Sequence, residues 1–238
     1  MPRDPRETFE RELRSAGYSV RRFYVDRFCD EQVQALPRDS VVLDLGGLKT
    51  GKRGLFDIGR YPLRVVCLNI ARDRRPDVQA DAAAIPFNDG SFDAVICAEV
   101  LEHVPDPRPV LGEAFRTLKT GGRLVATAPF LYRLHGDPYD FARYAPEYWR
   151  RTLSAAGFGP VTIWQQGRLP SVLADVAKQW VSEGGVGRPF GRVAAGAASG
   201  FARWAVRRDC RPAASAGVFQ QTFATGFGLL GVKSHTRS

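Results

Sequence analysis

Residues 129–144 bring together histidine, carboxylate and arginine side chains. The segment holds His135, Asp137, Asp140 and Arg143 together with three tyrosines. Histidine takes up and releases protons near neutral pH, and a neighbouring carboxylate polarises its ring. The segment therefore predicts a substrate-facing loop with His135 as a general base, polarised by Asp137 or Asp140. The alternative is a loop held by an ion pair between Asp140 and Arg143, with a structural histidine.

A second histidine, His103, follows two carboxylates. Glu99, Glu102 and His103 are spaced i, i+3 and i+4, so a helix would place all three on one face. With His135 they would supply ligands for a divalent ion that grips vicinal hydroxyls. Carboxylates in a first helical turn also suit the helix dipole without any ion. We predict a catalytic role for His103 and no resident metal.

Glycines and hydrogen-bonding side chains occur at three further places. Asp44, Gly46 and Gly47 end one apolar run, Asn69 ends the next, and Asp81 follows in a loop. Glycines let the backbone pass close to a ligand, and polar groups at strand ends bind cationic groups or ribose hydroxyls. Asp81 would accept a hydrogen bond from an exocyclic amine such as that of adenine, although helix capping also explains it.

The glycine loop does not match two common phosphate-binding motifs. No Ser or Thr follows Lys52, as the phosphate-binding loop of nucleotide hydrolases requires. Leu48 stands where the dinucleotide-binding fingerprint needs its second glycine. The loop therefore predicts a different ligand.

The elements that must position these residues are short, unbroken apolar runs. Such runs indicate strands buried on both faces, and hence a parallel sheet with helices on either side. Ligands bind beyond the carboxyl ends of such strands, which is where the polar residues fall. The predicted strands are residues 41–45, 64–68, 92–97, 123–127, 161–164 and 227–232.

Helical patterns flank this predicted sheet. Residues 1–40 read as an N-terminal helical segment, and residues 41–238 as the main domain. A helical insert, about 168–221, precedes the last strand. Within it, an apolar stripe at helical spacing is formed by Val172, Leu173, Val176 and Trp180.

Four stretches carry a resemblance to a known family. They are residues 81–93, 98–107, 113–124 and 156–158, which read DAAAIPFNDGSFD, AEVLEHVPDP, EAFRTLKTGGRL and AGF. Over about residues 41–164 the chain resembles a class I S-adenosylmethionine-dependent methyltransferase of the type 11 group. The resemblance implies a Rossmann-like, doubly wound α/β fold with a seven-stranded, mostly parallel sheet and a reversed last strand. It also implies S-adenosylmethionine as the cofactor.

The resemblance assigns cofactor contacts by position. Asp44, Gly46 and Gly47 would contact the methionine part of the cofactor, and Asn69 its ribose. Asp81 and Ala82 would contact the adenine. Cys97 and Glu99 would lie near the methyl group. Two departures stand out: Leu48 and Thr50 interrupt the usual glycine spacing, and Asn69 replaces the usual acidic residue. They leave open a non-catalytic cofactor-binding or scaffold protein.

The function that this resemblance implies is methyl transfer by in-line displacement, which depends mainly on positioning. We predict a small-molecule or glycan-type acceptor, methylated on oxygen or nitrogen. The alternative is a nucleic-acid methyltransferase that uses the basic C-terminal third. Against nucleic acid, the tail lacks regular interleaving of aromatic and basic residues.

Composition sets the remaining expectations. The 238 residues carry a formal net charge of +9, and the four cysteines have no metal-like pairing, which favours free thiols and a cytoplasmic location. From Arg168 onward there are ten basic and three acidic residues. Arginines of the insert, including Arg188 and Arg192, would suit peripheral contact with an anionic membrane. A substrate lid or a homodimer interface explains the same pattern.

Overall fold

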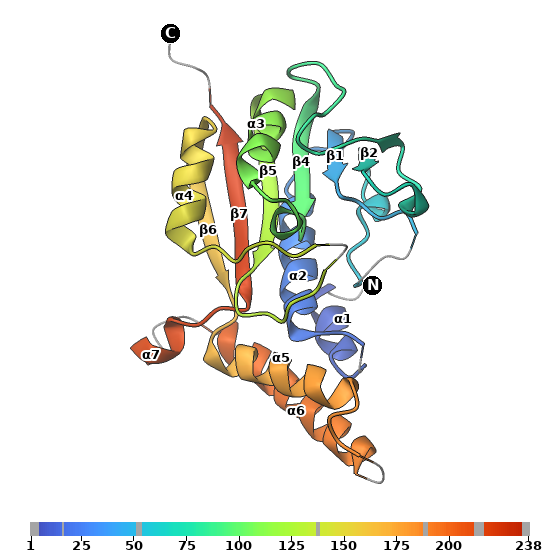
Figure 1. The fold of residues 1–238 in the computed structure, drawn as a ribbon, viewed down its shortest axis with the longest axis vertical. Coiled ribbons are helices and arrows are strands. Elements are labelled where there is room, and N and C mark those ends of the chain that lie inside the picture. The colour runs from blue at the N-terminus through green and yellow to red at the C-terminus, as the bar shows by residue number, and fades with distance from the viewer. Residues whose placement is uncertain are drawn as a thin grey trace.

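The computed structural model describes residues 5–15, 17–50, 54–136, 139–187, 190–211 and 217–234 (Figure 1). Gly51, Asp137 and Arg188 lie outside the described residues.

A seven-stranded sheet in the order β3-β2-β1-β4-β5-β7-β6 forms the centre of the molecule. β7 runs antiparallel to both of its neighbours, and the pairs among β1 to β5 are parallel. The prediction of a mostly parallel sheet with a reversed last strand is confirmed. The strands are β1 (Val41–Leu45), β2 (Arg64–Asn69), β3 (Val78–Gln79), β4 (Phe92–Ala98), β5 (Leu118–Pro129), β6 (Phe158–Gln166) and β7 (Gly226–Lys233).

Three strands differ most from the sequence-based prediction, and one of them is β6, which spans Phe158–Gln166 where 161–164 was predicted. β3 has only two residues, too few to give an apolar run. β5 begins at Leu118, five residues before the predicted run. The buried Leu118 is followed by Lys119, Thr120 and two glycines, and Lys119 Nζ donates to Asp93 Oδ1 of β4 at 2.7 Å. An ion pair thus extends a strand that apolar patterning alone does not reveal.

Helices cover both faces of the sheet (Figure 1). On one face α3 (Pro107–Thr117) and α4 (Pro146–Ala155) bury Leu111 and Trp149 against the strands. On the other face α2 (Val20–Gln34) buries Val25 and Phe28. Successive residues of β4 point to opposite sides, so Val95 joins the first cluster and Ile96 the second.

A second, smaller core joins the N-terminal helices to the insert between β6 and β7. Its elements are α1 (Pro5–Glu12), α2, α5 (Leu169–Ser182) and α6 (Gly191–Asp209). The short α7 (Val218–Gln221) follows α6 and buries no residue. Phe9, Leu13 and Phe23 pack in this core against Ala202 and Val206 of α6. The two helical segments that the sequence presents separately therefore form one unit beyond the carboxyl ends of the parallel strands (Figure 1).

Polar contacts from α5 fix this helical unit. Asp175 Oδ1 accepts hydrogen bonds from the backbone N–H groups of Val20 (2.7 Å) and Arg21 (3.2 Å), at the first turn of α2. The buried Lys178 Nζ donates to the carbonyl oxygens of Leu13 at 2.9 Å and Ser15 at 2.5 Å. Side chains of the insert thus satisfy backbone groups of the N-terminal segment that would otherwise be buried without partners.

The predicted apolar stripe of the insert faces two ways. Val172 is buried, whereas Leu173, Val176 and Trp180 are largely exposed. None of the helices within the described ranges combines the length and the apolar character needed to cross a bilayer.

Candidate active site

The glycine loop after β1 leaves no room for side chains. Gly46 has a φ of +74°, in the left-handed region, and a Cβ there would overlap Cγ2 of Val100. A Cβ on Gly47 would overlap the carboxylate of Asp44. The carboxylate at the end of β1 therefore lies directly against bare backbone.

Asn69, at the end of β2, holds this loop in place. Its Nδ2 donates to the Gly47 carbonyl oxygen at 3.0 Å, and its Oδ1 accepts from the Ala71 N–H at 2.9 Å. The side chain is buried, and both ends of its amide are used inside the protein. This supporting role was not predicted from the sequence, and ribose binding by Asn69 stays a prediction.

The loop with the predicted adenine contacts, Asp81 and Ala82, is anchored from α3. Asp81 Oδ1 accepts from the Ala83 N–H at 2.8 Å, a local turn. Further along, Glu113 Oε2 accepts from the Ile85 N–H at 2.8 Å. Arg116 donates to the carbonyl oxygens of Ile85 (2.9 Å) and Phe87 (2.8 Å). Glu113 and Arg116, both in α3, thus hold the backbone of residues 85–87 in place.

Cys97 and Glu99, predicted near the methyl group, lie in different surroundings. Cys97 is buried in the core, and burial followed by the nearby Glu102 and Asp44 carboxylates raises the pKa of its thiol. Glu99 turns toward α2, where Arg21 Nη2 donates to Oε1 at 2.5 Å and Nε to Oε2 at 3.1 Å. Burial opposes the charge of Glu99, yet Arg21 holds its pKa below the ordinary value.

The shared helix face expected for Glu99, Glu102 and His103 is not formed. Glu99 has a φ of +56°, and only Leu101–His103 make a single 3₁₀ turn. The chain turns sharply after β4 instead of entering a helix, so Glu99 points to Arg21 and away from the other two. The expectation of one helical face was wrong at this position.

Glu102, His103 and His135 do come together. His103 Nε2 lies 3.8 Å, and His135 Nε2 3.7 Å, from Glu102 Oε1. The two imidazole rings meet edge to face with centroids 5.1 Å apart. Burial, followed by the charge of Glu99, raises the pKa of Glu102, and the Glu102 carboxylate raises the pKa of His135. We call Glu102, His103 and His135 the Glu-His-His cluster.

Asp140 holds the loop that carries His135. Its Oδ2 accepts from the His135 N–H at 2.9 Å and from Arg143 Nη2 at 2.7 Å. Hydrogen bonding to Arg143 lowers the pKa of Asp140 to about 2. The ion pair of the alternative interpretation is thus present, and Asp140 Oδ2 is also 3.4 Å from His135 Nδ1. The catalytic roles of His135, Asp140 and His103 stay predictions.

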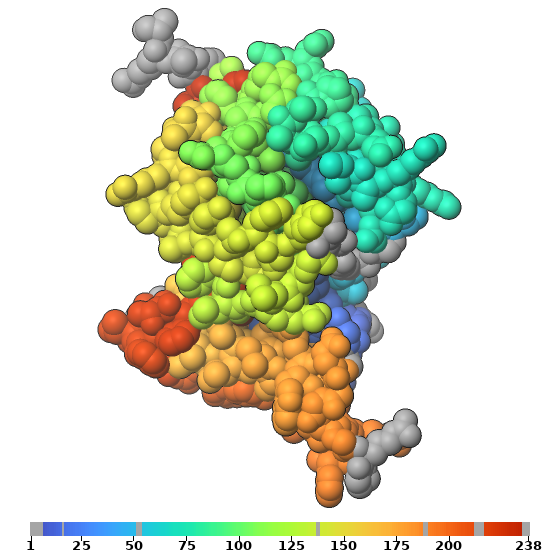
Figure 2. Space-filling view, viewed as in Figure 1, coloured from blue at the N-terminus to red at the C-terminus, as the bar shows by residue number. Residues whose placement is uncertain are grey.

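The segment with His135 is a surface feature (Figure 2, yellow-green). Its described part lies between the helices that cover the sheet and the helical insert. Four of its apolar side chains are more than a third exposed: Leu131, Leu134, Tyr139 and Phe141.

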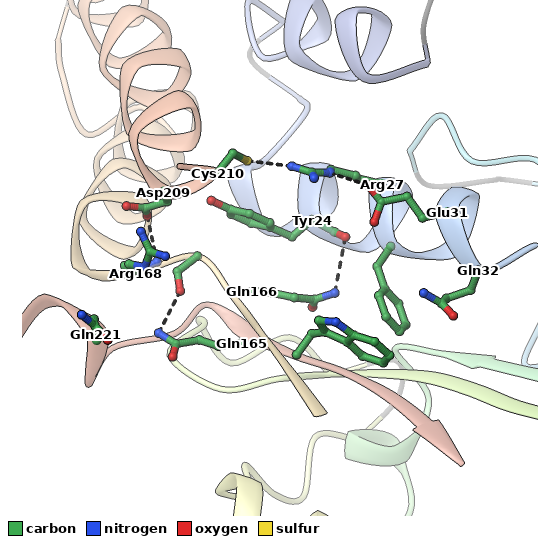
Figure 3. Close-up of a pocket in the computed structure, with 13 residues that line it drawn as sticks. Tyr24, Arg27, Glu31, Gln32, Gln165, Gln166, Arg168, Asp209, Cys210 and Gln221 are labelled. Atoms are coloured by element: carbon green, nitrogen blue, oxygen red, sulfur yellow. Dashed lines mark hydrogen bonds and ion pairs between the residues drawn. The ribbon is translucent and has the colours of Figure 1, made fainter. Parts of the chain in front are cut away.

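A separate cavity of about 320 Å³ lies between α2, the end of β6 and the end of α6 (Figure 3). Tyr24, Arg27, Gln166 and Cys210 are among its lining residues, and Arg27 Nη1 donates to Cys210 Sγ at 2.7 Å. The described residues that line it include none of those predicted for the site.

Part of the sheet and its loops is similar in sequence to known proteins. Residues 57–126 match a family model described as a methyltransferase domain. The demethylmenaquinone methyltransferase of Renibacterium salmoninarum is 35% identical over 139 residues, which cover 54% of this chain and 56% of that protein. Residues 57–126 of this chain are therefore similar to a methyltransferase domain, as the resemblance seen in the sequence implies.

Two further proteins similar to this chain are also methyltransferases. The sarcosine/dimethylglycine N-methyltransferase of Halorhodospira halochloris is 30% identical over 165 residues, covering 56% of this chain and 57% of that protein. A phosphoethanolamine N-methyltransferase 2 from Haemonchus contortus, in complex with S-adenosyl-L-methionine, has the same fold with a TM-score of 0.53 at 14% identity. That match covers 95% of this chain and 60% of the other. The chain spans little more than half the length of the two curated relatives.

The family match covers one side of the candidate site better than the other. Residues 57–126 include Asn69, Asp81 and the pair Glu102–His103. They end before the loop with His135 and before the helical insert. The similarity to this family model therefore does not extend to the His135 loop or to the helical insert.

Proposed function

We propose that this chain transfers a methyl group from S-adenosylmethionine to an oxygen or nitrogen of a small molecule with an apolar body. One observation carries the proposal. The Asp44 carboxylate lies against the bare backbone of Gly47, next to Gly46, at the same strand edge as the Glu-His-His cluster.

The residues at the end of β1 suit the proposed cofactor. S-adenosylmethionine, when bound, supplies a methyl group on a positively charged sulfur and carries an amino-acid end with an ammonium group. Asp44 offers that end a carboxylate, and Gly46 and Gly47 let it approach the backbone, since a Cβ at either position would fill the space. The clamp of Glu113 and Arg116 keeps the loop of Asp81 and Ala82 available for the base.

The acceptor side combines a polar group with apolar surface. The Glu-His-His cluster is a proton acceptor of the kind that a hydroxyl or protonated amine needs before it attacks. Leu134 and Tyr139, 83% and 64% exposed, lie on the same segment as His135. An acceptor with an apolar body would cover these side chains and present its polar atom to the cluster. Similarity to a demethylmenaquinone methyltransferase and to a ubiquinone biosynthesis O-methyltransferase supports such an acceptor.

Calorimetric titration tests the cofactor half of the proposal. Wild-type protein should bind S-adenosylmethionine and S-adenosylhomocysteine with one site per chain. Asp44→Ala should weaken binding of S-adenosylmethionine at least tenfold, because the ammonium group of the cofactor loses its negatively charged partner. Glu147→Ala, which removes an exposed carboxylate from α4, is the matched control and should bind as wild type does. Absence of binding to wild type would overturn the proposal.

A screen tests the acceptor half. The protein is incubated with S-adenosylmethionine and panels of hydroxylated aromatics, prenylated phenols, small amines and unmodified transfer RNA, and released S-adenosylhomocysteine is measured. Turnover should be highest with acceptors that join a hydroxyl or amine to an apolar ring or chain. If transfer RNA were the one acceptor in these panels that gives turnover, the acceptor would be a nucleic acid and the proposed small-molecule acceptor would be wrong.

A further inference from the structure

Glu102 is a buried carboxylate without a hydrogen-bond partner. The residue is 1% exposed, and neither of its carboxylate oxygens finds a partner within the described residues. A buried charge of this kind is costly unless a cation or a proton compensates it. Either a proton on this carboxyl group or a cation beside it therefore compensates the burial.

The groups nearest to Glu102 are two imidazole nitrogens. Nε2 of His103 and Nε2 of His135 both face Oε1, at 3.8 and 3.7 Å. These separations are too long for hydrogen bonds, for which donor and acceptor lie about 2.7–3.2 Å apart. One ligand atom from each of the three residues lies within 4.8 Å of the others. Three donor atoms thus surround a point that a metal ion of short bond length would occupy.

The outer nitrogens of both rings are held by oxygen atoms. His103 Nδ1 donates to the carbonyl oxygen of Tyr139 at 2.6 Å, and His135 Nδ1 to that of Arg133 at 3.2 Å. When Nδ1 donates to these carbonyl oxygens, Nε2 of each ring keeps its lone pair and directs it toward Glu102. Arg143 Nη2 also lies 3.4 Å from His135 Nδ1. Metal-binding histidines are oriented by their second nitrogen in the same way.

We propose that Glu102, His103 and His135 bind one divalent first-row transition-metal ion, with coordination positions left for an acceptor oxygen. Two imidazoles and one carboxylate suit zinc, manganese or iron better than magnesium, which prefers oxygen ligands throughout. Glu99 is not a ligand, because Arg21 already neutralises it. The proposal departs from the sequence-based prediction of no metal.

The ion gives the cluster a specific role in methyl transfer, a role that rests on the proposed function. Held by Glu102, His103 and His135, such an ion would supply a positive charge that lowers the pKa of an acceptor hydroxyl beside it. His135 is then a ligand instead of a general base. The exposed apolar side chains of its segment hold the acceptor's body beside the ion.

Metal binding is tested with the metal-free full-length chain. Titration with zinc chloride and manganese chloride should give one saturable site, and cobalt(II) should develop visible absorption bands in the wild type. Glu102→Gln, His103→Ala and His135→Ala should each weaken binding at least tenfold, whereas His235→Ala, outside the described residues, should bind as wild type does. Wild-type affinity in Glu102→Gln, or no saturable site, would overturn the proposal.

Thermal unfolding keeps the test decisive if a variant folds poorly. Added zinc should raise the midpoint of the wild type and leave that of Glu102→Gln unchanged, while Glu102→Gln should unfold at a higher temperature than the metal-free wild type. Titration with S-adenosylmethionine, run in parallel, separates the two proposals. Cofactor binding without metal binding removes only the metal site, and metal binding without cofactor binding removes only the proposed function.

Discussion

Arg21 of α2 forms a two-point ion pair with Glu99 at the end of β4, and both side chains are buried. The same guanidinium also donates to Gln166 at the end of β6. One arginine from the N-terminal helix therefore ties together the ends of two strands that are far apart in the sheet order. The Glu-His-His cluster begins three residues after Glu99, so this ion pair supports the candidate site.

Arg21→Met should destabilise the protein strongly. The variant leaves the Glu99 carboxylate buried without its cation, which costs about 3–5 kcal/mol of unfolding free energy. Urea denaturation at pH 7 measures the loss. Arg21→Met combined with Glu99→Gln should recover part of it. A double variant that loses the sum of both single effects would show that the two residues are not coupled.

The same ion pair predicts a dependence on pH. Arg21 holds the pKa of Glu99 below its ordinary value, so the stabilisation is present above about pH 4.3, where an unperturbed glutamate ionises. It is lost as the pH falls through the lower folded-state pKa. The difference in unfolding free energy between wild type and Arg21→Met should therefore be largest near neutral pH and shrink in acid. A constant difference would contradict this origin.

Gly46→Ala should damage both stability and cofactor binding. Its left-handed backbone costs a non-glycine residue about 1–2 kcal/mol, and the added Cβ also overlaps Val100. Gly121→Ala is a matched control, because Gly121 has a φ of +80° but open space around it. The control should lose stability and keep its affinity for S-adenosylmethionine in calorimetry. Adding Val100→Ala to Gly46→Ala should restore part of the stability.

Arg116→Ala should loosen the loop of Asp81. Four hydrogen-bonded groups lose their partner, including the carbonyl oxygens of Ile85 and Phe87. Ordering the loop upon binding would then cost about 1 kcal/mol more, which corresponds to roughly a fivefold loss of cofactor affinity. Arg108→Ala, which removes an arginine whose ion pair with Asp106 is largely exposed, should bind as wild type does. Equal affinity of both variants would show that the clamp does not matter.

Asp175→Ala should release the start of α2. The N–H groups of Val20 and Arg21 lose a buried acceptor, at a cost of about 1–3 kcal/mol. Amide hydrogen exchange should accelerate in the first turn of α2. Asp175→Asn keeps an acceptor oxygen of the same shape and should stay closer to wild type. Faster exchange confined to α5 would place the role of Asp175 elsewhere.

The sheet was predictable because its strands are buried on both faces and read as unbroken apolar runs. The exceptions have identifiable causes: β3 is too short, and the start of β5 depends on the polar contact between Lys119 and Asp93. The family resemblance located Asp44, Gly46 and Gly47 at the end of β1, where the structure places them together.

The helical contribution to the site was not predictable from local pattern. Arg21 lies in a helix whose buried residues are mostly apolar, and its partner Glu99 is 78 residues away. Arg21 is one of six charged residues in α2, and no local pattern distinguishes it from the other five. Glu99 itself was misplaced because helical spacing was assumed where the backbone makes a left-handed turn. Long-range ion pairs and single turns leave no periodic trace in a sequence.

The capping of α2 by Asp175 links two residues 155 positions apart. α2 leaves the ribosome long before α5 has been synthesised, and until then its first turn lacks this acceptor. The hydrogen bonds that hold the start of α2, and with it Arg21, therefore form only late in translation. A nascent polypeptide that ends before residue 169 contains β1 to β6 but lacks Asp175, so the position of Arg21 depends on the carboxy-terminal helices.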